Sequence, residues 1–139
     1  NAELNKQIEE GKRERIRSIV ESIEPTLTEE DGIVLIARQA DFLPDIVKGI
    51  AFGLKPKFPN LVFVIGSAVG GKPALTVMLG DEIVSRGVDA SKVVREAAKE
   101  ISGGGGGQPF YATAGGKDVA GIEKAIFRAV ELIKTQLKR

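Results

Sequence analysis

The residues that invite a chemical interpretation lie in one segment near the end of the chain, which contains five consecutive glycines, Gly103 to Gly107, and then a glycine pair, Gly115-Gly116. Glycine lacks a side chain and permits positive φ, so a run of backbone amides can form a concave nest for an anion such as a phosphate. Asp118 can cap a following helix whose first amides would face the same ligand. The glycines equally suit a loop that passes close to a neighbouring strand, and the pattern leaves both interpretations open.

Several kinds of catalytic site are excluded by the composition. The 139 residues include no histidine and no cysteine, so the chain holds no Ser-His-Asp triad, no thiolate nucleophile and no cysteine-ligated zinc. The glycine segment is not a P-loop, because Asp118 follows Lys117 where serine or threonine is required. Helix caps or strand-end turns already explain the carboxylates Asp41, Asp81 and Glu82. We therefore expect no catalytic residue and no metal site in this chain.

The overall charge gives no long-range attraction for a nucleic acid. The chain has 20 basic and 19 acidic residues, which leaves a formal charge of +1. Binding to RNA would therefore depend on local clusters of lysine and arginine. The longest apolar runs, 33–37 and 61–65, are far shorter than the roughly 20 residues that span a bilayer, and no signal-peptide pattern opens the chain. We expect a cytoplasmic protein that does not contact a membrane.

The hydrophobic pattern around the glycine segment predicts an α/β fold, with a small mixed sheet of about four strands flanked by helices. The apolar runs at 33–37 and 61–65 do not alternate with polar residues, which is typical of strands covered on both faces. A glycine-rich connection at 66–73 leads into a strand at 74–79, so these two neighbours are expected to form a hairpin. The short apolar stretch at 110–112 is expected at an edge of the sheet.

Three helices are predicted to follow capping residues in this part of the chain. The caps are Asp41 for the first helix, Asp89 or Ser91 for the second, and Asp118 for the third. Gly103 is expected to supply the left-handed residue that ends the second helix. Together with the strands, these helices predict one globular domain over residues 25–139.

A long amphipathic helix is predicted before the globular domain, over residues 1–24. Its apolar positions form a seam that is too narrow to be covered by one globular core alone, so partner helices are expected. Gly11 lies inside the helical pattern and lowers its intrinsic helix stability by about 1 kcal/mol relative to alanine. We interpret residues 1–24 as the C-terminal end of a helical subdomain.

The glycine segment resembles the glycine-rich signature at the end of alanyl-tRNA synthetases, within the wider family of DHH-associated domains. The resemblance covers roughly residues 30 to 139. The residues that match the signature after the first glycines are Pro109, Ala112, Ala114, Gly115 and Gly116. Gln108 stands where the family usually has arginine or lysine, and Thr113 stands where it usually has glutamine.

The resemblance implies a non-catalytic C-terminal domain that binds the outer corner of tRNA(Ala) and promotes homodimerisation. The parent enzyme would ligate alanine to tRNA(Ala), and its ATP, magnesium and zinc would belong to the catalytic and editing domains upstream in the same chain. No cofactor is expected in this fragment. The family also implies that the helical subdomain takes part in dimerisation. The predicted dimerisation residues are Leu4, Ile8, Ile16, Ile19 and Ile23.

If the domain binds tRNA, basic side chains should converge with the glycine segment, because phosphate contacts dominate such affinity. The last helix is the best candidate, although a charged stripe is usually only a solvated face. Phe110 and Tyr111 can both stack on unpaired bases, but one of the two is expected in the core. Tyr111 is the better candidate for stacking, because its hydroxyl tolerates a wet edge. The predicted tRNA-binding residues are Lys72, Gly104, Gly105, Gly106, Gly107, Gln108, Tyr111, Gly115, Gly116, Lys117, Lys124 and Arg128.

Two alternatives remain open at this point. The chain could be the substrate-binding domain of a DHH-family phosphoesterase, with the glycines holding a nucleotide phosphate. Gln108 argues against this, because related phosphoesterases carry a histidine after the glycines. The chain could also be a pure oligomerisation module in which the glycine segment only packs, and such a module would form a dimer that ignores RNA.

Overall fold

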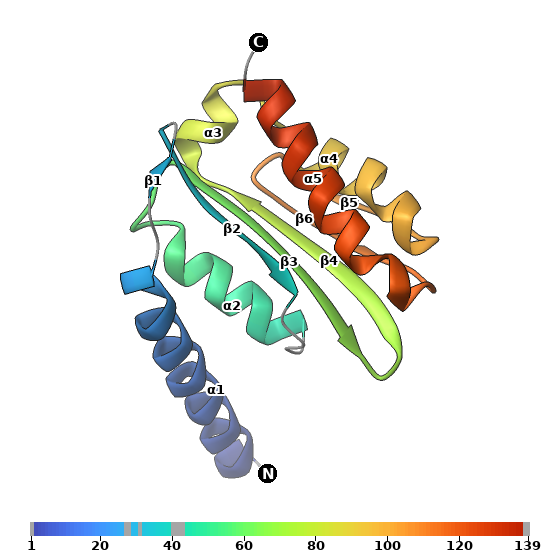
Figure 1. Cartoon of the computed structure of the whole chain (residues 1–139). Helices are drawn as coiled ribbons and strands as arrows, with labels where there is room; N and C mark the ends of the chain where they lie inside the picture. Colours follow the sequence, from blue (N-terminus) through green and yellow to red (C-terminus); the bar gives the residue numbers. More distant parts are fainter. Residues whose placement is uncertain (1, 27–28, 31, 40–43, 138–139) are drawn as a thin grey trace.

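A single mixed sheet forms the centre of the molecule, with helices on both of its faces (Figure 1). The structure is a computed structural model that describes residues 2–26, 29–30, 32–39 and 44–137. The strand order is β1-β2-β3-β4-β6-β5. The strands are β1 (Glu29–Glu30), β2 (Ile33–Gln39), β3 (Leu61–Val69), β4 (Lys72–Leu79), β5 (Gly104–Gly107) and β6 (Tyr111–Gly115). The helices are α1 (Ala2–Ile23), α2 (Pro44–Leu54), α3 (Asp81–Ser85), α4 (Ala90–Ala97) and α5 (Ile122–Leu137).

The predicted α/β class is confirmed, and the sheet is somewhat larger than expected. The predicted strands correspond to β2, β3, β4 and β6. The additional ones are β1, which has only 2 residues, and β5, which consists of glycine alone. Neither offers the alternating or continuous apolar pattern that marks a strand in a sequence. As a result β5, and not the apolar stretch at 110–112, takes the edge position beside β6.

Strands β2 and β3 run parallel, with Val34 opposite Leu61, and α2 connects them across one face of the sheet. The hairpin predicted after β3 is confirmed, because β3 and β4 pair antiparallel as far as Val69 and Lys72. Its turn consists of Gly70 and Gly71, with φ of +64° and +75°. Two-residue turns with positive φ match the twist of antiparallel strands, so the two strands extend through most of the predicted glycine-rich connection.

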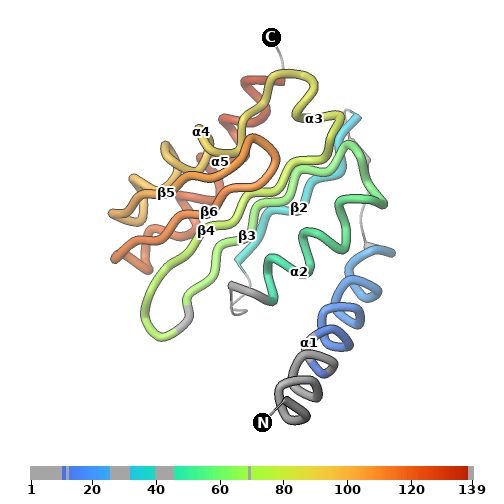
Figure 2. Tube along the Cα trace, turned by 180° about the vertical axis from the view of Figure 1, so that it is seen from behind, coloured from blue at the N-terminus to red at the C-terminus, as the bar shows by residue number. Residues whose placement is uncertain are grey.

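The continuous apolar runs are explained by two cores, one on each face of the sheet. Val34, Phe63 and Met78 pack in the core that includes α1 and α2. Val64 and Val77 pack in the core that includes α4 and α5. Phe63 is 1% exposed and Val64 is 0% exposed, so neighbours in β3 are buried on opposite faces. The view from behind shows the same three layers (Figure 2).

Two of the three predicted caps are confirmed. The carboxylate of Asp89 accepts a hydrogen bond of 2.9 Å from the Ser91 amide, so Asp89 is the cap of α4. The carboxylate of Asp118 accepts one of 3.1 Å from the Ala120 amide, where a 3-10 turn leads into α5. Asp41 lies outside the described residues.

The prediction for the end of α4 is wrong. Ser102, with φ of +54°, is the left-handed residue that follows α4 and its 3-10 turn, and Gly103 has no positive φ. Gly103 packs directly against the Gly115 carbonyl oxygen, so close approach to β6 is the reason for a glycine at this position.

Helix α1 continues unbroken through Gly11 and packs on α2 of the same chain. Ile16 lies over Gly49 and Val20 lies over Gly53, so the absence of side chains at these glycines lets the helices approach closely. Val20 is buried in the core beside α2. The C-terminal half of the apolar seam therefore finds one partner helix, α2, within the globular domain, and the expectation of further partner helices for the rest of the seam stays a prediction.

All five predicted dimerisation residues lie on α1, and the structure describes the side chains of three of them. Ile23 is buried in the core, and Ile16 and Ile19 are partly buried against it. The side chains of Leu4 and Ile8 lie outside what the structure describes. The core of the same chain thus covers Ile23 and parts of Ile16 and Ile19, which were predicted to lie in a dimer interface.

Candidate functional site

The glycine run forms the edge strand of the sheet. β5 pairs antiparallel with β6, with Gly104 opposite Gly115 and Gly107 opposite Ala112. At the turn between them the Gln108 amide donates a hydrogen bond of 2.7 Å to the Tyr111 carbonyl. Because β5 is an extended strand, the anion-binding nest, one of the two interpretations of the pattern, is not formed there.

The other interpretation, close approach to a neighbouring strand, is confirmed. A Cβ atom on Gly105 would overlap the Thr113 carbonyl oxygen of β6, and one on Gly103 would overlap the Gly115 carbonyl oxygen. By contrast, nothing lies within 4 Å of the same position on Gly104. Glycine at position 103 thus serves close packing and not a left-handed cap.

The glycine strand also lies against α4. A Cβ atom on Gly106 would be 3.6 Å from the Ser91 hydroxyl and 3.7 Å from the Arg95 guanidinium. Arg95 is exposed and makes no ion pair within the described part of the chain. Sequence reasoning missed this cation, because its position beside β5 depends on how α4 packs on the sheet.

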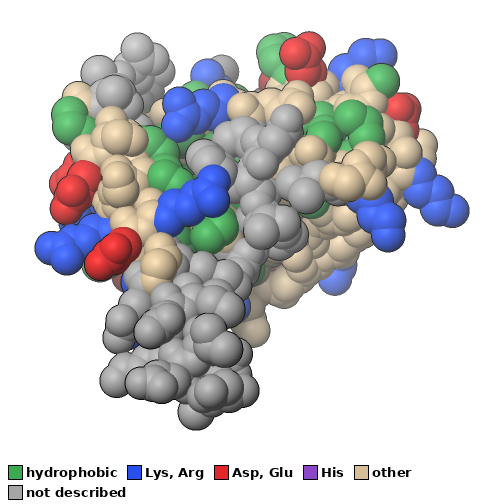
Figure 3. All heavy atoms as spheres, turned by 90° about the horizontal axis from the view of Figure 1, so that it is seen from below, with side chains coloured by type: hydrophobic (Ala, Val, Ile, Leu, Met, Phe, Trp, Pro, Cys, Tyr) green, Lys and Arg blue, Asp and Glu red, His purple; other side chains and the backbone are tan. Residues whose placement is uncertain are grey.

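The predicted tRNA-binding residues of the glycine hairpin and β4 divide into two groups at opposite ends of β6. Lys72 and Lys117 lie at the end that carries the β3–β4 turn, where the Gly116 amide donates a hydrogen bond of 3.1 Å to the Pro73 carbonyl. Gln108 lies in the turn at the other end. The view from below shows basic side chains dispersed among acidic and hydrophobic ones (Figure 3). The described part of that view thus lacks a continuous basic face.

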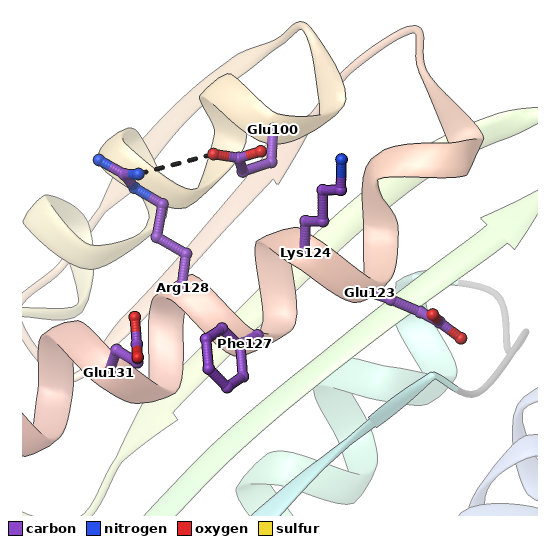
Figure 4. Close-up of a pocket in the computed structure, with 6 residues that line it drawn as sticks. All are labelled: Glu100, Glu123, Lys124, Phe127, Arg128 and Glu131. Atoms are coloured by element: carbon purple, nitrogen blue, oxygen red, sulfur yellow. Dashed lines mark ion pairs between the residues drawn. The ribbon is translucent and has the colours of Figure 1, made fainter.

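Helix α5 carries both remaining predicted cations, but its exposed face is mixed in charge. Lys124 and Arg128 line a shallow pocket of about 390 Å³ (Figure 4). The Arg128 guanidinium lies 3.5 Å from a carboxylate oxygen of Glu96 and 3.5 Å from one of Glu100. Arg128 is therefore engaged within the protein, whereas Lys124 makes no ion pair among the residues that the structure describes. The other residues that line the pocket are Glu100, Glu123, Phe127 and Glu131.

The pKa of Glu96 is lowered by its two basic neighbours, Lys99 and Arg128. A hydrogen bond from Lys99 and the positive charge of that side chain hold the pKa of Glu96 below its ordinary value, and Arg128 contributes in the same direction. The same contacts therefore stabilise the ionised carboxylate, which pairs with Arg128 in place of an external anion.

Three aromatic rings form a second candidate surface, the aromatic patch, which consists of Phe52, Phe110 and Tyr111. The Phe52 ring centroid lies 6.5 Å from that of Phe110 and 5.3 Å from that of Tyr111. Lys55 Nζ lies 4.2 Å from the Phe110 ring centroid. Phe110 and Tyr111 are both half-buried, so the expectation that one of them is a core residue is met only in part. Sequence reasoning missed Phe52, which lies on α2 outside its apolar stripe.

Tyr111 offers a direct test of this geometry, because it is the only tyrosine of the chain. Burial raises the pKa of its phenol above the ordinary value of 10.0. A raised pKa means that the folded state binds the proton more tightly than the unfolded state does, so the contribution to stability is complete below the ordinary pKa and is lost as pH rises through the folded one. We expect an ultraviolet titration to show delayed phenolate formation, and Tyr111→Phe to lessen the alkaline loss of stability in unfolding curves. An unshifted titration would contradict the packing described for this ring.

Two of the three carboxylates considered from the sequence, Asp81 and Glu82, have structural partners, and Asp41 lies outside the described residues. Asp81 lies 3.5 Å from Lys55, and Glu82 lies 3.3 Å from Arg86 within one turn. Among the described residues, no three acidic, histidine or cysteine side chains come together as metal ligands would. Within the same part of the chain, no helix has the length and apolar character needed to cross a membrane.

These features define a small mixed α/β domain in which a glycine-rich hairpin closes one edge of a sheet that is covered by helices on both faces. The chain belongs to the DHHA1 domain family, whose model matches residues 31–139. This range includes every strand from β2 to β6 and leaves out α1.

Sequence relatives of the chain include alanine–tRNA ligases. It is 47% identical over 133 residues to the enzyme of Bacteroides thetaiotaomicron, a match that covers 95% of this chain and 15% of that protein. It is 42% identical over 134 residues to the enzyme of Cytophaga hutchinsonii, a match that covers 94% of this chain and 15% of that protein. The chain therefore spans only a small part of the length of these relatives.

Two solved structures share the fold. The C-Ala domain of Aquifex aeolicus alanyl-tRNA synthetase matches with a TM-score of 0.63 and 28% identity, over 81% of this chain and 98% of that one. A DHH domain protein from a family of ribosomal proteins matches with a TM-score of 0.56 and 17% identity, over 90% of this chain and 31% of that one. The second likeness concerns the fold alone.

Proposed function

We propose that this chain is a non-catalytic C-terminal domain of an alanyl-tRNA synthetase, and that it binds tRNA(Ala) and promotes dimerisation. The observation that carries the proposal is the match to the C-Ala domain, which extends over 98% of that domain at 28% identity. The parent enzyme ligates alanine to tRNA(Ala) with ATP in the cytoplasm, and magnesium and zinc belong to its upstream catalytic and editing domains. By holding the tRNA, this domain raises the effective concentration of the acceptor end at those domains.

Within this proposal, residues 1–24 are the end of a helical subdomain and residues 25–139 are the globular part. Dimerisation is assigned to Leu4 and Ile8, together with the parts of Ile16 and Ile19 that the core leaves uncovered. Ile23 is only 7% exposed, so it supports α1 within its own chain in this arrangement.

The lysines at the β3–β4 end of the sheet are the strongest candidates for phosphate contacts. Lys72 and Lys117 are exposed and make no ion pair within the described residues, so their charges are available to a polyanion. Arg128 is held by two carboxylates, and a phosphate would have to displace them. Lys124 is exposed and makes no ion pair among the described residues, but it shares its pocket with Glu100, Glu123 and Glu131, so the charge on α5 is a weaker basis for RNA binding than the sequence pattern indicates.

The difference between the unpaired lysines, Lys72 and Lys117, and the paired Arg128 predicts how each affects the salt dependence of tRNA affinity. The double variant Lys72→Ala with Lys117→Ala should bind a tRNA(Ala) transcript more weakly and lower the slope of log K against log salt by about 2, because each lost phosphate contact removes about 1. Arg128→Ala is the matched control and should change the slope less. The measurement is a fluorescence anisotropy titration at two salt concentrations, with a single-stranded DNA of equal length beside it.

The opposite result would favour the pure oligomerisation module. If the wild-type chain bound neither nucleic acid, or bound both equally and without salt dependence, the tRNA proposal would fail for this domain. Analytical ultracentrifugation of the same sample would then show whether the chain still forms a dimer.

A further inference from the structure

The aromatic patch differs from the rest of the exposed apolar surface. Among the described residues, the most exposed large hydrophobic side chains are Phe52, Val119 and Phe127. Phe52 is 40% exposed and is the one that contacts other aromatic rings. Its ring lies at an interplanar angle of 83° to Phe110 and 47° to Tyr111, so two half-buried rings support it. An exposed ring held in one orientation presents a rigid flat face at a small entropic cost.

Two lysines lie over rings of the aromatic patch, Lys48 over Phe52 and Lys55 over Phe110. Lys48 Nζ lies 5.9 Å from the Phe52 ring centroid, and Lys48 makes no ion pair within the described part of the chain. Lys55 Nζ lies over the Phe110 ring and 3.5 Å from a carboxylate oxygen of Asp81, which is itself exposed. Lys48 lies on α2 and Lys55 directly follows it, so their spacing relative to the ring does not depend on a long loop. Flat aromatic surface beside positive charge is the combination that proteins use to bind single-stranded nucleic acid.

From this geometry we infer that the aromatic patch is a stacking site for an unpaired nucleobase of RNA, with Phe52 as the stacking ring and Lys48 beside the adjoining phosphate. The inference rests on the proposed RNA-binding function and assigns a part of it to α2. Every base has a π-face, so such a site tolerates different bases and distinguishes unpaired from paired segments. It lies on the opposite face of the sheet from α5, where the sequence pattern favours the main RNA contacts.

Phe127 provides an internal comparison within the same chain. It is 65% exposed, which is more than Phe52. It lies in the pocket of mixed charge on α5, where the three carboxylates of Glu100, Glu123 and Glu131 outnumber the cations Lys124 and Arg128 and make the pocket less attractive to a phosphate backbone. The chain thus has an exposed phenylalanine on each face of the sheet, one supported by aromatic rings beside lysines and one in a pocket of mixed charge without a ring contact among the described residues, which allows a stacking role to be separated from a general apolar effect.

The test compares Phe52→Ala with Phe127→Ala, using the full chain and a labelled tRNA(Ala) transcript, a single-stranded oligoadenylate and a fully paired RNA duplex. Removing an aromatic ring that stacks on one base should weaken binding of the transcript and the oligoadenylate by roughly 5- to 150-fold. Phe127→Ala and the duplex should show no comparable loss. Phe52→Trp should retain binding, and Lys48→Ala should lower the salt slope by about 1. Thermal unfolding of each variant checks that the fold is intact.

A spectroscopic readout places the ligand at the patch. Tyr111 is the only tyrosine and the chain has no tryptophan, so tyrosine emission reports on this surface alone. Oligoadenylate should quench this emission in the wild-type chain and in Phe127→Ala, but much less in Phe52→Ala, after correction with free tyrosine amide for absorption by the bases.

The outcomes separate this inference from the proposed function. If RNA binds the wild-type chain and Phe52→Ala binds it equally well, the stacking site is wrong and the proposed function stands. If the wild-type chain binds no RNA, both fail. Loss of self-association in Phe52→Ala without any effect on RNA binding would identify the patch as a protein interface and would also overturn the inference.

Discussion

Replacing Gly105 by alanine is expected to destabilise the domain by about 1–3 kcal/mol, whereas the same replacement at Gly104 should leave stability unchanged or raise it by about 0.5 kcal/mol. The two glycines are neighbours in β5, and both have φ outside the left-handed region. They differ in what an added methyl group would meet. At Gly105 it would overlap the Thr113 carbonyl oxygen, and at Gly104 it would meet nothing within 4 Å.

The cost at Gly105 arises because the obstacle is main chain. A flexible side chain can rotate away from an added methyl group, but the Thr113 carbonyl belongs to β6, which also pairs with β4 through Thr76. The edge strand would therefore have to move outward and loosen its pairing with β6. Urea unfolding monitored by far-ultraviolet circular dichroism measures both variants against the wild-type chain. Equal midpoints for the two alanine variants would show that β5 does not lie as close to β6 as the structure has it.

The same strand explains what sequence reasoning can and cannot predict about the fold. β2 and β3 are recognisable because their side chains are buried on both faces, and Asp89 and Asp118 are recognisable because caps use a local hydrogen bond. β5 has no side chains, so neither its strand character nor its pairing partner leaves a periodic signal. The close contact between β5 and β6 depends on both segments. The glycine run alone is compatible with close packing and also with an anion-binding loop, so the sequence does not decide between them.

Less of the candidate site than of the fold can be predicted from the sequence, because its features depend on contacts between elements that are distant in the chain. Charge patterns along α5 are visible in the sequence, but the partners of Arg128 lie on and after α4, at Glu96 and Glu100. The aromatic patch joins Phe52 of α2 to two rings that lie far later in the chain. Both features depend on packing between elements, which local spacing does not encode.

Val20→Asp is expected to release α1 from the globular domain. Val20 is 5% exposed and packs over Gly53 of α2, where a Cβ atom would be 3.1 Å from a Val20 methyl group. A carboxylate at this position would lose its hydration without gaining a partner, which costs several kcal/mol and exceeds the contribution of a single apolar side chain, about 1.5–3 kcal/mol. Ser18→Asp adds the same charge on the exposed side of the same helix and should leave α1 in place.

Hydrogen exchange followed by mass spectrometry distinguishes release of α1 from global unfolding. Most of the stability of a helix in a protein comes from the packing of its amphipathic face, so the α1 amides of Val20→Asp should exchange at least about 100-fold faster, while those of β3 and β4 keep their protection. Protected α1 amides in Val20→Asp would show that contacts other than those with α2 hold the helix. If that protection also depended on protein concentration, the helix would be held by a second copy, and the seam around Ile16 and Ile19 would serve dimerisation more than packing within one chain. Loss of protection at all concentrations would instead mean that any dimer must form on an α1 that is already docked on its own domain.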